Sequence, residues 1–161
     1  MFNFFAKKKV SSEDMAANLY LVFIRDAVKK PETDIDGNII IDENEQRLLL
    51  LSHVCELLEA RDLNKVKLQL LSIFVRDNRK IKDEGDLLVE MLVVVDSIKK
   101  IKDFFSQIPK ESHEFVAKDW VFNRNLNPIQ KIMILPWYVE HTKVATSTFE
   151  SVLKKVSVID G

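Results

Sequence analysis

The chain has 161 residues, of which 47% are hydrophobic and 30% charged, and its formal net charge is −1. This composition excludes an intrinsically disordered chain, and the lack of a basic excess argues against a general nucleic-acid-binding protein. Only three glycines and four prolines interrupt the sequence, so long helices are expected. We predict an all-α fold in which residues 1–161 form a single-domain bundle of five to six helices.

The first ten residues are expected to form a flexible or peripheral tail. Three phenylalanines precede three lysines there, which is the reverse of the order in a secretory signal peptide. Phe2, Phe4 and Phe5 with Lys7–Lys9 are the candidates for contact with an anionic membrane surface, although one short apolar turn binds lipid weakly. No apolar run reaches the ~20 residues that cross a bilayer.

Cys55 is the single cysteine of the chain and lies within an apolar helical run. One cysteine cannot form an intramolecular disulfide, so a reducing compartment, the cytoplasm, is the expected location. We expect its thiol to be buried and unreactive, as is usual for a cysteine in a hydrophobic core.

The first helix is predicted from Ser12 to about Lys30. Ser11 and Ser12 are favourable N-caps, and Pro31 should end the helix because proline disfavours helical backbone at the residue before it. One face of this segment is apolar over its whole length, at Ala16, Leu19, Phe23 and Ala27.

The segment from Pro31 to Gln46 is the most acidic part of the chain, with six carboxylates and no Lys or Arg. With Gly37 at the sixth place of a twelve-residue loop, its register resembles an EF-hand calcium loop over residues 32–43. Oxygen ligands would come from Asp34, Asp36, Asn38 and Glu43. Three positions depart from that pattern: Pro31 before the loop, Glu32 at its first place and Ile40 at its ninth.

The same segment fits a β-hairpin, which we prefer. Asp36-Gly37 is a favoured two-residue turn, and the isoleucines Ile39–Ile41 are good strand formers. Asp42 and the glutamates after it are then explained by the start of the next helix. An isolated hairpin is marginal, so its isoleucines must pack on the bundle or on a second chain. Ile39 and Ile41 are therefore candidates for partner contact.

A second helix is predicted to start near Asp42, and Asn64 is the expected start of a third. Their short connection predicts antiparallel neighbours. A fourth helix should run from Asp83 or Asp86 to Pro109, with a heptad seam at Leu87, Met91, Val94, Ile98, Ile101, Phe105 and Ile108.

The fourth helix has a second apolar stripe beside its heptad seam, at Leu88, Leu92 and Val95. A helix that is apolar on two faces is typical of the centre of a bundle. We therefore predict that this helix is central, and a two-chain coiled coil is the alternative.

A fifth helix is predicted from Ser112 to about Asn123. Asn125–Pro128 is then a loop and helix cap, with Pro128 at a first helical position. Pro136 should break or kink the chain, and a last helix is expected from Trp137 to about Val156. If Trp137 and Tyr138 are exposed beside Pro136, they are further candidates for partner contact, because aromatic residues dominate interface hot spots.

The sequence holds no P-loop, dinucleotide fingerprint, nucleophile elbow or zinc-ligand spacing. We therefore expect a non-enzymatic protein-interaction or regulatory module without a cofactor, acting on a protein partner or by self-association as a dimer. The first alternative is a Ca²⁺-binding or small-ligand-binding protein using the 32–43 loop. The second is a nucleic-acid-binding regulator with a helix-turn-helix, whose reading helix would start with Lys65, Lys67 and Gln69.

Overall fold

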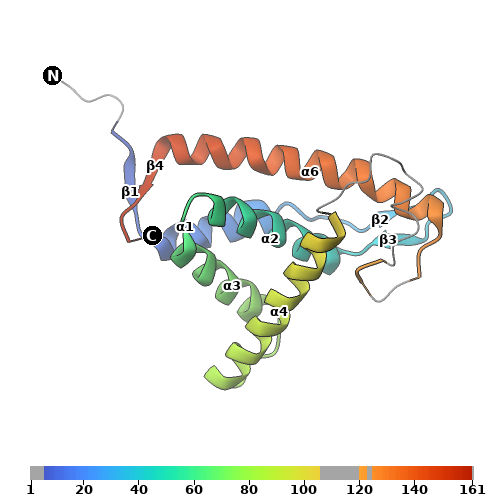
Figure 1. Ribbon diagram of the computed structural model, residues 1–161, viewed down its shortest axis with the longest axis horizontal. Helices are drawn as coiled ribbons and strands as arrows, with labels where there is room; N and C mark the ends of the chain where they lie inside the picture. Colours follow the sequence, from blue (N-terminus) through green and yellow to red (C-terminus); the bar gives the residue numbers. More distant parts are fainter. Residues whose placement is uncertain (1–5, 106–119, 123–124, 161) are drawn as a thin grey trace.

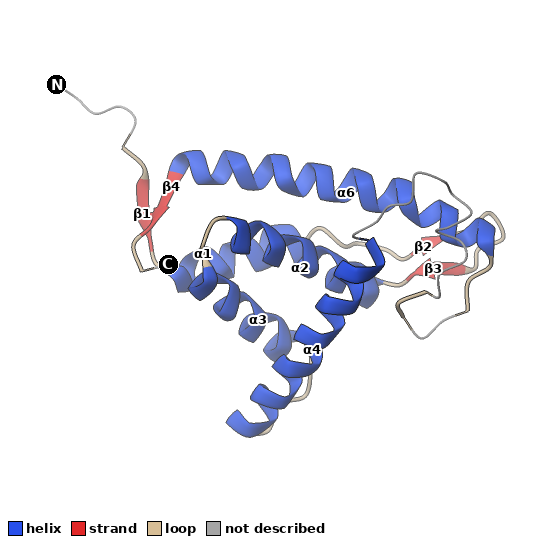
Figure 2. Ribbon diagram, in the orientation of Figure 1, coloured by secondary structure: helices blue, strands red, loops and turns tan. Residues whose placement is uncertain are grey.

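The computed structural model describes residues 6–105, 120–122 and 125–160. Helices make up most of this part of the chain, which confirms the prediction of a mostly helical fold. Four short strands pair at the two ends of the molecule (Figure 2). One pair lies in the segment for which a hairpin was predicted, and the other pair was not predicted.

The first helix, α1 (Ser12–Leu19), continues directly into a π-helix, η1 (Tyr20–Arg25). The predicted cap is present, because the Ser11 side chain accepts a hydrogen bond from the backbone N–H of Asp14 at 3.0 Å. The helix ends before the predicted Lys30. Its last turn is widened, since the N–H of Asp26 donates to the carbonyl of Leu21 rather than to residue 22.

The second helix, α2 (Glu43–Ala60), is the most enclosed helix of the described chain. The Asp42 side chain caps it by accepting from the N–H of Glu45 at 2.8 Å. Four consecutive leucines, Leu48–Leu51, are all buried and together cover its circumference. Consistent with this, α2 contacts η1, α3 (Asn64–Asn78), α4 (Glu84–Phe105) and α6 (Pro128–Lys155).

The prediction that the fourth helix is central was wrong. The inward seam of α4 is buried as predicted at Leu87, Val94, Ile101 and Phe105, whereas its second stripe faces outward. The reason is that the four leucines of α2 already occupy the centre, so α4 lies at the edge of the molecule beside α3 (Figure 1). Ile108 and Pro109 lie outside the described residues.

The prediction that Pro136 separates two elements was also wrong, because α6 runs through it. Proline removes only its own backbone hydrogen bond, and the inward face of α6 is held by buried Ile134, Trp137, Ala145 and Phe149. Asn127 and Gln130 form a reciprocal capping box at its start, where Pro128 is the first helical residue as predicted. Most of the predicted 112–123 helix lies outside the described residues, and 120–122 are not helical.

One strand pair ties distant segments together, and the other is a local hairpin. β1 (Lys8–Val10) runs parallel to β4 (Val156–Val158), so the segment expected as a tail includes a strand. β2 (Glu32–Thr33) pairs antiparallel with β3 (Ile39–Ile41). In Figure 1, α6 lies along the length of the molecule, with β1 and β4 at one end and β2 and β3 at the other. None of the helices in the described ranges combines the length and apolar character that spanning a membrane would need.

Candidate functional site

The acidic loop is organised around the carboxylate of Asp34. Its Oδ1 accepts from the backbone N–H groups of Asp36 at 3.0 Å and Asn38 at 2.8 Å. Its Oδ2 accepts from the side-chain amides of Asn38 at 3.1 Å and Gln130 at 3.0 Å. These donors favour the charged form, and Gln130 contributes most to holding the pKa of Asp34 below its ordinary value. Gly37 completes the turn with φ of +85°, a conformation that suits glycine.

This arrangement uses the lone pairs that a cation would need. Asp34 bonds to four donors, and Asp36 and Asn38 are exposed around it, while Glu43 lies beyond the hairpin in the first turn of α2. Across residues 6–105, 120–122 and 125–160, no three His, Cys, Asp or Glu side chains are grouped as a metal site. Asp34, Asp36 and Asn38 therefore form a hydrogen-bonded turn in this conformation, and Glu43 lies outside it.

The structure places the four candidate partner-contact residues differently from one another. Ile39 is 41% exposed, but Ile41 is fully buried and Trp137 nearly so. Tyr138 is partly buried and stacks on Phe105, with ring centroids 3.8 Å apart and planes 11° apart. Ile41 and Trp137 thus offer no surface in this conformation, and the isoleucine arm of the hairpin packs on its own bundle.

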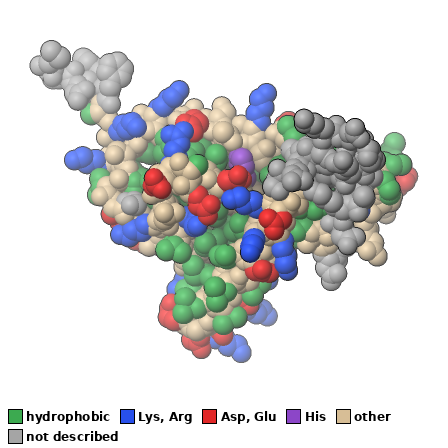
Figure 3. All heavy atoms as spheres, viewed as in Figure 1, with side chains coloured by type: hydrophobic (Ala, Val, Ile, Leu, Met, Phe, Trp, Pro, Cys, Tyr) green, Lys and Arg blue, Asp and Glu red, His purple; other side chains and the backbone are tan. Residues whose placement is uncertain are grey.

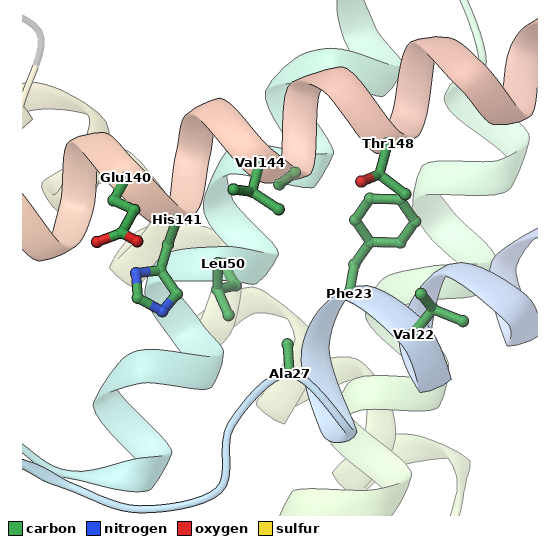
Figure 4. Close-up of a pocket in the computed structure, with 9 residues that line it drawn as sticks. Val22, Phe23, Ala27, Leu50, Glu140, His141, Val144 and Thr148 are labelled. Atoms are coloured by element: carbon green, nitrogen blue, oxygen red, sulfur yellow. The ribbon is translucent and has the colours of Figure 1, made fainter.

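A groove runs between η1 and α6 and encloses a cavity of about 300 Å³. Figure 4 shows side chains of α6 projecting toward η1 and α2 across it. Its walls are mostly apolar, and Val22 and Val144 stand exposed at its rim. The polar groups that line it are Glu140, His141 and Thr148.

The imidazole of His141 is held in a defined orientation at one end of this groove. Its Nδ1 lies 2.8 Å from the carbonyl oxygen of Trp137 and must donate to it, since a carbonyl only accepts. The ring also stacks on Trp137 at 4.3 Å. His53 lies elsewhere, bonded to Thr146, and burial lowers its pKa. The groove therefore offers apolar walls and one imidazole, without a nucleophile beside a base.

A further exposed surface is the outward face of α4, which we call the α4 apolar face. Its five members are exposed by 45–69% and recur at helical spacing: Leu88, Val89, Leu92, Val93 and Val95. Figure 3 shows hydrophobic side chains gathered over α4 and the neighbouring part of α3, with charged groups around them. Monomeric proteins mostly expose such residues singly, so a contiguous group of this kind is a candidate interaction surface. The stripe was visible in the sequence, but its periodicity could not show that none of the described helices and strands covers it.

The basic residues that suggested nucleic-acid binding pair with acids of the same chain. At the start of α3, Lys65 bonds Asp160 at 3.3 Å and Lys67 bonds Glu59 at 2.7 Å. In α4, Lys100 likewise bonds Asp96 at 3.1 Å. These pairs leave a face of mixed charge rather than a continuous basic surface.

Comparison of the chain with protein-family models, with curated proteins and with solved structures gave no significant match to any of them. The candidate site therefore rests on the geometry of this molecule alone.

Proposed function

We propose that this chain is a non-enzymatic protein-interaction module that contacts another polypeptide through the α4 apolar face. The observation that carries the proposal is the outward placement of Leu88 and Leu92, which are 63% and 69% exposed. Two leucines and three valines on this helix remain in contact with water. They therefore lack the stabilisation that burial gives to apolar side chains in the rest of the fold. A helix face of this kind is the usual partner surface in helix-mediated recognition.

The side chains with nucleophilic chemistry support a non-enzymatic role. Burial raises the pKa of the Cys55 thiol to about 12, so its reactive thiolate does not form near neutral pH. His141 donates to the carbonyl of Trp137. The Thr146 hydroxyl beside His53 donates its proton to the carbonyl of Thr142, so His53 is not placed to take that proton. A free, buried thiol is also compatible with our proposed cytoplasmic location.

The test is site-specific photocrosslinking in living cells with the full chain. A photoreactive residue at Leu92 should give discrete polypeptide adducts. The control position is Ile129, which is 71% exposed and lies on a different helix. Adducts at position 92 should disappear in a Leu88→Glu background, because a charge on the same face prevents apolar docking. Equal adducts at both positions, or none at position 92, would overturn the proposal.

A further inference from the structure

We propose that the occupant of the α4 apolar face is the same helix of a second copy of this chain, paired antiparallel about Leu92. This inference rests on the proposed function, since both use the same face. It goes further by naming the partner and its orientation. The evidence is the distribution of charge along α4, which is independent of its apolar exposure.

The charges of α4 are unevenly distributed along the helix. Its first two turns carry only acids, Glu84, Asp86 and Glu90, whereas its last two carry three lysines, Lys99, Lys100 and Lys102, and one acid, Asp103. The α4 apolar face lies between these two ends. An antiparallel pair centred on Leu92 places residue 84 of one helix opposite residue 100 of the other, so Glu84 of each copy meets Lys100 of its partner copy. A parallel pair would place like charges together, which opposes association.

These charges are available to a partner. Lys100 pairs with Asp96 on its own helix, and both side chains are more than 60% exposed. Glu84 pairs with Arg76 of α3 and is 81% exposed. Exposed pairs of this kind contribute little to stability, so their exchange for pairs across a dimer costs little. A two-fold axis also uses the same patch on both copies, as the commonest soluble oligomers do.

The size of the face predicts a reversible dimer. One helix face covers a few hundred Å² per chain, which is below the ~800 Å² per partner of a standard stable interface. We therefore expect dissociation constants of roughly micromolar to millimolar. Sedimentation over that range of concentration should show a monomer–dimer equilibrium for the purified full chain. Leu92→Glu should weaken it by about tenfold or more, and Ile129→Glu should leave it unchanged.

Charge reversals at positions 84 and 100 test the orientation, because a single reversal creates new like-charge pairs only if these two positions face each other. Glu84→Lys alone and Lys100→Glu alone each place like charges opposite one another in both halves of an antiparallel dimer. Each variant should therefore lose self-association at low salt. Mixing the two variants restores an acid opposite a lysine at both ends, so they should form a mixed dimer. Failure of the mixture to associate while each variant still self-associates would exclude the antiparallel arrangement.

Cysteine crosslinking measures the same orientation directly. The native Cys55 is buried, so it should not compete with the introduced cysteines. In the antiparallel pair, Leu88→Cys on one copy lies opposite Asp96→Cys on the other, so a mixture of the two variants should crosslink. Leu88→Cys should not crosslink to itself, since the two positions lie ~12 Å apart along the helix axis. Self-crosslinking at position 88 would indicate a parallel pair and overturn the inference.

The two proposals can fail separately. A purified chain that stays monomeric over the whole concentration range, while Leu92 still crosslinks to other polypeptides in cells, overturns the second-copy inference only. A monomer without adducts at Leu92 overturns both.

Discussion

The Nε2 of Gln130 donates to the Oδ2 of Asp34 at 3.0 Å, joining positions 96 residues apart. The same glutamine accepts from the N–H of Asn127 through its Oε1 at 3.0 Å. One side chain therefore both caps α6 and fixes the acidic hairpin against it. The hairpin carboxylate that first suggested metal chemistry thus links the acidic hairpin to the start of α6.

Replacing Asp34 with asparagine should destabilise the protein at neutral pH. In asparagine, an amide nitrogen replaces one carboxylate oxygen. This nitrogen cannot accept the hydrogen bonds that Asn38 or Gln130 donates to that oxygen. Asp36→Asn is the control, because Asp36 is exposed and uses only its backbone N–H in this turn. Thermal unfolding of both variants should show a lower Tm for Asp34→Asn alone. Equal Tm values would show that the turn does not depend on this carboxylate.

The effect of Asp34 should also depend on pH. Its pKa is lowered in the folded protein, so its contribution to stability is present above the ordinary aspartate pKa and lost as pH falls through the folded value. The Tm difference between the wild-type chain and Asp34→Asn should therefore shrink in acid. A difference that stays constant down to strongly acidic pH contradicts this account.

Calcium should not stabilise the chain. The ion would have to displace four hydrogen bonds from Asp34 and bring in Glu43 from the first turn of α2. Millimolar Ca²⁺ should therefore leave the Tm unchanged, whereas a bound ion raises it by mass action. A Ca²⁺-dependent rise that Asp36→Asn abolishes would revive the calcium-loop interpretation.

Helix starts were predictable because their chemistry is local. Ser11, Asp42 and Asn127 each accept a hydrogen bond from the backbone N–H three residues ahead. Such a cap depends on residues adjacent in the sequence and can be predicted from them. Helix ends and interruptions depended more on tertiary contacts. Packing of Trp137 and its neighbours against the bundle holds α6 continuous through Pro136, and no local rule includes that contribution.

Long-range relationships were beyond sequence reasoning for a different reason. Periodicity identifies which faces of a helix are apolar, but not which face finds a partner. The Leu88 stripe was therefore assigned to a core that α2 already fills. The pairing of β1 with β4 joins segments that are far apart in the sequence. The only local sign of a strand there is the β-branched pair Val156 and Val158. The Asp160 carboxylate strengthens that closure by accepting from the N–H of Ser12 at 2.5 Å.

Neighbouring isoleucines of β3 should differ strongly in their contribution to stability. Ile41 is fully buried, whereas Ile39 is 41% exposed on the same strand. Ile41→Ala should lower the free energy of unfolding by about 2–5 kcal/mol, because it leaves a cavity in a packed core. Ile39→Ala should change it by less than about 0.5 kcal/mol. Chemical denaturation of the two variants makes the comparison, and similar losses would mean that the hairpin packs differently.

The hydroxyl of Tyr20 joins η1 to α3 through a short hydrogen bond to Asp77, and it accepts from the Nδ2 of Asn78 at 3.1 Å. Tyr20→Phe should lower the free energy of unfolding by about 1–3 kcal/mol, because Asp77 and Asn78 lose a partner. Tyr138→Phe is the matched control, since Tyr138 contributes chiefly a stacked ring. Chemical denaturation should show a loss of less than about 0.5 kcal/mol for that control.

The contribution of Tyr20 should disappear in alkali. Burial, followed by the hydrogen bond to Asp77, raises the pKa of Tyr20 to about 12. A raised pKa means that the stabilisation is complete below the ordinary tyrosine value of 10 and is lost as pH rises through the folded value. The stability difference between the wild-type chain and Tyr20→Phe should therefore fall as pH rises above 10. Phenolate absorbance of the folded chain, measured in the same range, should stay low. A rise in phenolate absorbance already near pH 10 that is missing from Tyr20→Phe would show that this hydroxyl is not buried against α3.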